Sequence, residues 1–152
     1  MIKQAPQPEL DGSKTRLRFW LQLLKATKHV ENEIRDRLRR EFDTTLPRFD
    51  VMAMLHKSGT GLKMSQLSSE LMVSNGNVTG IIDRLVGDGL VIRVSIKGDR
   101  RATLVRLTPK GEAVFGEMAV THEGWVNELL AELDDAEISQ VVDTLAKVRE
   151  LT

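Results

Sequence analysis

The feature that most constrains the fold of this 152-residue chain is a change of hydrophobic period at Leu90. Before Leu90, apolar side chains recur every three or four positions, which predicts two short helices over 64–71 and 74–87. After it, apolar and polar side chains alternate as far as Leu107, with turn residues at 97–100, which predicts a β-hairpin. Two helices joined by a short turn and followed by a hairpin are the winged helix-turn-helix arrangement.

Further helices are expected on both sides of this unit. Apolar residues recur at helical steps from about 13 to 42, and Thr45 can cap a second helix. After the hairpin, Thr108 precedes a long helix that is expected to reach about residue 133, and Asp134 can cap a last helix. The predicted fold class is therefore mainly α with a small β-hairpin wing.

This pattern divides the chain into three parts. Residues 45–108 form the winged helix-turn-helix lobe, 13–44 and 109–152 form helical flanks, and 1–12 form a loose N-terminal arm. The first helix carries a longer apolar stripe than a small domain can cover, which favours a homodimer over a purely intramolecular core. The side chains expected to meet there, some of them across the dimer, are Leu17, Trp20, Leu21, Leu24, Trp125 and Leu129.

Several function classes lack support in the composition. The chain has no Cys, which excludes disulfides, thiolate zinc sites and cysteine redox sensing. His29, His56 and His122 are too scattered to suggest a helical metal site, and there is no Gly-rich phosphate loop or nucleophile elbow. The apolar runs are too short to cross a bilayer. We therefore expect a cytoplasmic protein that is not an enzyme, with no metal, no cofactor and no membrane partner.

The charges are unevenly distributed although the formal net charge is zero. The segment 14–40 and the segment 93–106 are rich in Lys and Arg, whereas 112–137 is acidic. Such a chain can present one positive face to double-stranded DNA. Ordinary solvated helix faces are the alternative explanation.

The helix that follows Ser74 is the first candidate for DNA recognition. Its apolar residues fall on one side and are expected to face the core. The opposite side presents Asn77 and Thr79, and these side chains suit the edge of adenine and the methyl group of thymine. Gly76 and Gly80 on that side cost roughly 1 kcal/mol each relative to Ala, which close approach to DNA would offset. The alternative is a surface helix without a role.

The tip of the predicted hairpin is the second candidate. Lys97, Arg100 and Arg101 surround a turn at Gly98. A slender loop with Arg at its tip suits the negative potential of a minor groove, and Asp99 can orient Arg101. The alternative is an exposed charged hairpin of no consequence.

The sequence closely resembles the MarR (multiple antibiotic resistance regulator) family over nearly its whole length. The resemblance is carried by LKMSQLSSELMVSNGNVTGIIDRLVGDGLVIR and GDRRATLVRLTPKG, above all by the Asp-Arg-Arg-Ala wing signature. It implies a homodimer joined by the terminal helices, with one helix in the major groove and the wing in the minor groove. Gly80, where many members carry Arg, and Lys63, in place of a small hydroxyl residue, depart from the pattern. The DNA-binding residues that it implies are Ser74, Asn75, Asn77, Thr79, Arg84, Asp99 and Arg101, and the charged hairpin tip adds Lys97 and Arg100.

The resemblance also implies release of DNA by a small effector, often an aromatic acid or phenol. The expected function is a repressor on a palindromic operator with half-sites roughly 34 Å apart. A winged-helix module for protein interaction is the main alternative, and an enzyme with an appended winged helix is a third. The residues expected to line the effector pocket are Trp20, Leu24, Met52 and His56, with Lys28 or His29 near a carboxylate; ordinary core and surface positions are the alternative for each.

Overall fold

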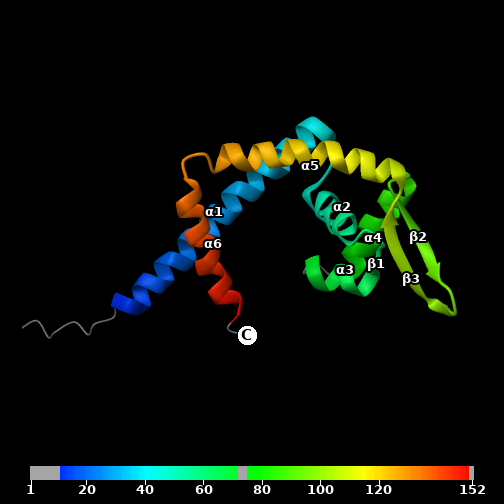
Figure 1. Cartoon of the computed structure of the whole chain (residues 1–152), viewed down its shortest axis with the longest axis horizontal. Coiled ribbons are helices and arrows are strands. Elements are labelled where there is room, and N and C mark those ends of the chain that lie inside the picture. Colours follow the sequence, from blue (N-terminus) through cyan, green and yellow to red (C-terminus); the bar gives the residue numbers. More distant parts are fainter. Residues whose placement is uncertain (1–10, 72–74, 151–152) are drawn as a thin grey trace, which may run out of the picture.

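The computed structural model describes residues 11–71 and 75–150 and is mostly helical, with one small antiparallel sheet (Figure 1). Figure 1 shows the β2–β3 hairpin projecting from a lobe of short helices, and α1 and α5 leading from that lobe toward α6. The elements are α1 (Asp11–Phe42), α2 (Leu46–Ser58), β1 (Leu62–Lys63), α3 (Met64–Leu71), α4 (Asn75–Gly87), β2 (Val91–Ile96), β3 (Asp99–Leu107), α5 (Pro109–Leu129) and α6 (Asp135–Arg149). The predicted fold class is confirmed.

Local side-chain caps set where three of the helices begin. The Thr45 hydroxyl accepts from the amide of Arg48 at 3.3 Å, and the Asp134 carboxylate accepts from the amide of Glu137 at 2.8 Å. Thr108 caps α5 in the same way. Each cap satisfies an amide that has no partner inside its helix, so the predicted helix starts at Thr45 and Asp134 are confirmed.

Two helix boundaries differ from the prediction. Helix α1 begins at Asp11, two residues before Ser13. Helix α5 ends at Leu129 and not near residue 133. Asp134 adopts an extended backbone (φ −81°, ψ 166°) to cap α6, so the preceding residues form a turn, closed by a 3.1 Å bond from the Leu133 amide to the Leu130 carbonyl.

The core of the lobe lies between α2, α3, α4 and the sheet. Val78, Ile82 and Leu85 of α4 are fully buried, and Ile81 beside them is half-buried. The predicted apolar side of α4 therefore faces the core, and it packs with a group of buried side chains from the other elements: Leu38, Val51, Met52, Leu55, Leu67, Val91 and Val105.

The sheet has the order β1-β3-β2 and is antiparallel throughout. Strands β2 and β3 form the predicted hairpin, with Val91 opposite Leu107, and Gly98 takes the positive φ of 95° that its turn requires. Strand β1 was not predicted, because two residues are too few to show an alternating pattern.

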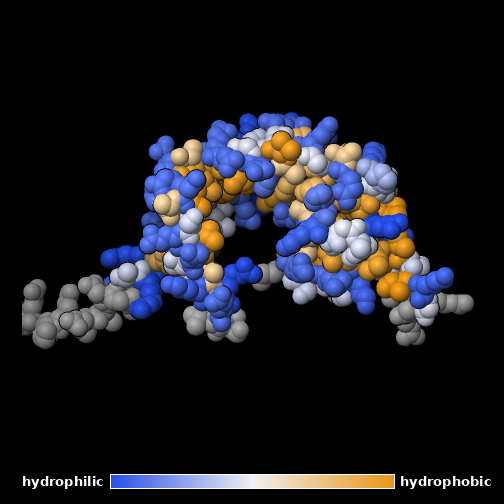
Figure 2. All heavy atoms as spheres, in the orientation of Figure 1, coloured by the Kyte–Doolittle hydropathy of each residue, from blue (hydrophilic) through white to orange (hydrophobic). Residues whose placement is uncertain are grey.

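Large apolar side chains stay exposed on α1 and α6. Trp20 of α1 is 53% exposed and Val142 of α6 is 58% exposed, and α6 has no buried residue. Trp125 packs instead against Phe42 near the other end of α1, with ring centroids 6.0 Å apart, so it does not meet Trp20 within the chain as expected. Figure 2 shows apolar surface on the arm that contains α6, where the arm faces the hollow beneath α5. Among the described residues, no helix is both long and apolar enough to span a bilayer.

The start of α5 depends on Gly111. A Cβ atom at this position would lie 2.0 Å from the carbonyl oxygen of Leu90, whereas one at Gly116 on the same helix would have no neighbour within 4 Å. We expect Gly111→Ala to lower the free energy of unfolding by about 1–3 kcal/mol. Gly116→Ala should leave it unchanged or raise it by up to about 1 kcal/mol. Urea denaturation measures both, and equal stability of the two variants would contradict this account of the α4–β2–α5 corner.

Candidate nucleic-acid interface

The exposed side of α4 follows directly from its buried side. Because Val78, Ile82 and Leu85 are fixed in the core, the opposite positions of the helix turn toward solvent. Asn77, Thr79, Gly80, Asp83 and Arg84 are all exposed, which is the arrangement that the sequence predicts. Helix α4 thus presents small and polar side chains on a rigid support.

The structure describes part of the predicted cationic tip of the wing. Lys97 is exposed at the end of β2, and Asp99, Arg100 and Arg101 begin β3, although their side chains lie outside the described part of the structure. Ser74 lies outside the described residues altogether. Asn75 begins α4, but its side chain is not described.

Two ion pairs connect α4 to its neighbours. Asp83 on the exposed side of α4 binds Arg93 of β2, and Asp88 just beyond α4 binds Arg48 of α2. Such partly exposed pairs contribute at most about 1 kcal/mol each to stability. They join the base of the wing and the start of α2 to α4, which holds the wing beside the polar side of the helix.

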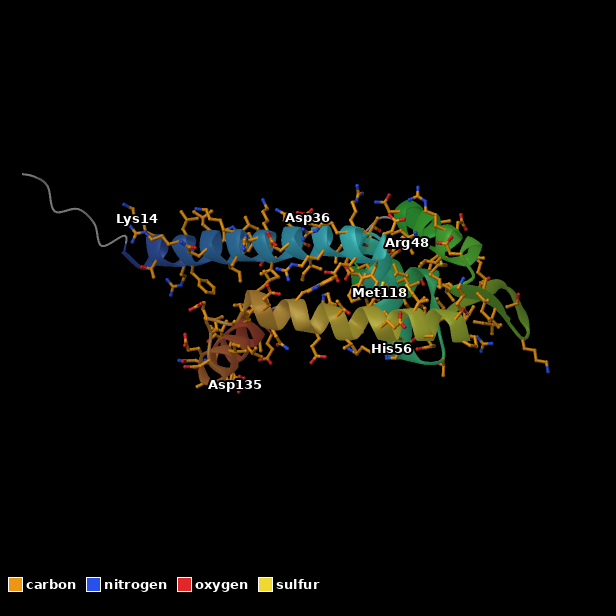
Figure 3. All side chains as sticks on the ribbon, turned by 90° about the horizontal axis from the view of Figure 1, so that it is seen from above. Lys14, Asp36, Arg48, His56, Met118 and Asp135 are labelled. Carbon is orange, nitrogen blue, oxygen red and sulfur yellow. The ribbon has the colours of Figure 1, made fainter. Side chains whose placement is uncertain are left out.

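The structure also reveals a basic groove that was not predicted from the sequence. It has a volume of about 480 Å³ and lies between the end of α1, the start of α2 and α4. Figure 3 shows Arg48 at this junction. The groove is bordered by Asn77 and Gly80 of α4 and by four arginines, Arg35, Arg39, Arg48 and Arg84.

The groove arginines differ in their partners. Arg35 donates to the side-chain oxygen of Asn32 at 3.0 Å, and Arg48 binds Asp88. Within the described residues, Arg39 and Arg84 have no carboxylate partner, and the buried Nε of Arg48 has no hydrogen-bond acceptor. The groove therefore carries unneutralised positive charge directly beside the exposed side of α4, which suits the phosphate groups of a nucleic acid.

A second cavity, of about 580 Å³, lies on the other side of α2. It is lined mainly by aliphatic side chains of α1 and α6, together with Leu46 and Asp50 of α2 and His122 of α5. Leu46 borders both this apolar cavity and the basic groove.

The six residues predicted to line an effector pocket border neither cavity. Met52 is 1% exposed in the core, and the Nδ1 atom of His56 lies 2.7 Å from a carboxylate oxygen of Glu112. Trp20, Lys28 and His29 are exposed on α1, and Leu24 is half-buried there. Neither of these two cavities thus brings the six residues together, and Met52 lies in the packed core. In the described part of the chain, no group of three or more His, Asp or Glu side chains is arranged to hold a metal ion.

Comparisons with known proteins agree with the interpretation of this surface as a nucleic-acid interface. A sequence profile described as the MarR family matches residues 44–103. The uncharacterized HTH-type transcriptional regulator YkoM of Bacillus subtilis is 30% identical over 117 residues, which cover 77% of this chain and 74% of YkoM.

Solved structures agree with this assignment. The crystal structure of a MarR family transcriptional regulator from Silicibacter pomeroyi has a TM-score of 0.78 and 31% identity, and the match covers 92% of this chain and 96% of that chain. A mutant MarR from E. coli complexed with operator DNA shares the fold, with a TM-score of 0.74 and 23% identity over 93% of this chain and 99% of that one. The chain therefore belongs to the MarR family and is a transcription regulator that binds DNA.

Proposed function

We propose that this regulator acts as a homodimer that represses transcription from a palindromic operator and is released by a small ligand. The observation that carries the DNA-binding part is the exposed polar side of α4 beside the unneutralised arginines of the basic groove. In this proposal α4 enters the major groove and the wing enters the adjacent minor groove. Two-fold symmetry would then place the half-sites about one helical turn, roughly 34 Å, apart.

The proposed contacts fall into two kinds. Asn77 and Thr79 are assigned to base edges, because an Asn amide pairs with adenine and a Thr methyl packs on thymine. Arg84 and Arg39 are assigned to phosphates, which position the protein without reading sequence. The remaining contacts are assigned to the start of α4, through Ser74 and Asn75, and to the wing, through Lys97, Arg100 and Arg101, with Asp99 orienting Arg101.

The dimer part of the proposal is supported by the exposed apolar side chains of α1 and α6. A contiguous apolar surface on a small protein commonly marks an interface. Burying one large aliphatic side chain contributes about 1.5–3 kcal/mol, so a few such contacts across two copies suffice for association. We assign the helices over 13–44 and 109–152 to the dimer and the lobe over 45–108 to DNA.

DNA affinity and its dependence on salt test the proposed contacts. The probe is a DNA duplex that the protein selects from a random-sequence pool. The affinity of the protein for this duplex is then measured by fluorescence anisotropy at several salt concentrations. Arg39→Gln should reduce the slope of log K against log salt by about 0.9, the value of one phosphate contact. Asn77→Ala should weaken the selected duplex by about 1–3 kcal/mol and leave a scrambled duplex unaffected, and Arg101→Ala should weaken binding to both.

Lys147→Gln is the matched control for Arg39→Gln, because Lys147 is an exposed cation on α6. Its salt slope should equal that of the parent protein. If the parent protein, Arg39→Gln and Lys147→Gln all show the same salt slope, the basic groove is not part of the DNA interface. A parent protein that selects no duplex would favour a protein-interaction module.

Sedimentation velocity tests the proposed dimer. Val142 on α6 is 58% exposed, and Ile92 on β2, in the lobe assigned to DNA, is 38% exposed. Val142→Asp should shift the protein to monomer at concentrations where the parent is a dimer, because a charge would be buried in the interface. Ile92→Asp should sediment like the parent. A dimer that survives Val142→Asp, or that dissociates equally in both variants, would contradict the assignment of α6.

A further inference from the structure

A row of cationic side chains on α1 leads away from the basic groove. Its residues recur at steps of three or four positions, so they lie one above the other on one side of the helix. All of these side chains are exposed. We call this row the α1 stripe, and it consists of Lys25, Lys28, Asn32, Arg35 and Arg39.

The α1 stripe is positively charged and contains no carboxylate. Among the described residues, no ion pair joins Lys25, Lys28 or Arg39 to an acidic side chain. Asn32 accepts a hydrogen bond from Arg35 at 3.0 Å, which holds that guanidinium along the helix without neutralising its charge. The stripe therefore carries positive charge that the described part of the chain does not balance.

The α1 stripe points away from the buried side of its helix. Figure 3 shows Lys14 and Asp36 on the side of α1 that faces away from α5. Lys25 lies midway between them in the sequence, about three helical turns from each, so it points to the same side. Ile34 and Leu38 are buried on the opposite side. Burial of unpaired cations in the proposed dimer interface would be costly, so the stripe is expected to stay open to solvent in the dimer.

The α1 stripe runs from the DNA-binding surface toward the part of the molecule that is assigned to the dimer. Arg35 and Arg39 border the basic groove together with Asn77 of α4, so this end of the stripe lies beside the recognition helix. From there α1 leads toward α6 (Figure 1). At 1.5 Å per residue, Arg39 and Lys25 are about 21 Å apart along the helix axis. Half of the proposed half-site spacing is roughly 17 Å, so the stripe is long enough to follow the duplex from one half-site to the operator centre.

We propose that the α1 stripe binds the DNA backbone between the two half-sites, with Lys25 and Lys28 on phosphates that α4 and the wing do not reach. Duplex DNA carries one negative charge per roughly 1.7 Å of its axis, so phosphates are available along the entire row. Such contacts add affinity and salt dependence but read no base sequence. The inference rests on the proposed homodimer on a palindromic operator and extends its DNA contacts to α1.

The salt dependence of DNA affinity tests the protein side of this contact. Lys25→Gln and Lys28→Gln should each reduce the slope of log K against log salt by about 0.9 for every phosphate contact that is lost. Both should weaken the selected duplex and a scrambled duplex by the same factor, because phosphates carry no sequence information. Lys25→Arg and Lys28→Arg should restore the parent slope, because the charge is retained. Lys147→Gln on α6 is the matched control and should keep the parent slope.

Duplexes with uncharged methylphosphonate linkages test the DNA side with the unaltered protein. Linkages between the half-sites should lower both the affinity and the salt slope. The same number of linkages at the two ends of the duplex, outside the proposed minor-groove contacts, should change neither. For the variant that carries both Lys25→Gln and Lys28→Gln, the central linkages should cause no further loss, because the interacting charges have already been removed.

Three results would overturn the proposal: a parent slope in the double Gln variant, unchanged binding of the parent protein to the centrally modified duplex, or the same loss of slope with Arg as with Gln. If any of these occurs while Arg39→Gln and Asn77→Ala behave as expected, the proposed function stands and only the α1 contact is wrong. A parent protein that selects no duplex would remove both the proposed function and this inference.

Discussion

The buried stripe of α4 is the constraint on which the rest of the interface depends. Val78, Ile82 and Leu85 are fully buried, and each contributes about 1.5–3 kcal/mol that a rotation of the helix about its axis would forfeit. The orientation of Asn77 and Thr79 is therefore set by the core and not by contacts of their own. A helix held in this way can present short side chains to DNA without first having to be ordered, which lowers the entropic cost of binding.

Helix α2 connects the DNA-binding surface to the rest of the molecule. Its buried side packs under α4, and Arg48 in its first turns binds Asp88 at the end of α4. Leu46 borders both the basic groove and the apolar cavity, so the two hollows share one wall. On the other side of α4, Asp83 holds Arg93 of the wing. Neither ion pair is strong, and the shared hydrophobic core is what mainly holds α4, α2 and the base of the wing together.

Features determined by neighbours in sequence could be predicted, and features determined by the tertiary fold could not. The caps at Thr45 and Asp134 were predictable because each side chain binds an amide only three residues ahead. The exposed side of α4 followed from its helical period. The basic groove was missed because Arg35 and Arg84 meet only once α1 and α4 are folded together. The apolar cavity beside α2 was missed for the same reason, because its walls come from α1, α2, α5 and α6.

The most direct test of the central claim is chemical footprinting of the selected operator with dimethyl sulfate. This reagent methylates guanine N7 in the major groove and adenine N3 in the minor groove. The account predicts two protected major-groove segments, related by two-fold symmetry and about 10 base pairs apart, each beside a protected minor-groove segment. Protection confined to the minor groove, or a single protected segment without symmetry, would contradict the placement of α4 and the wing.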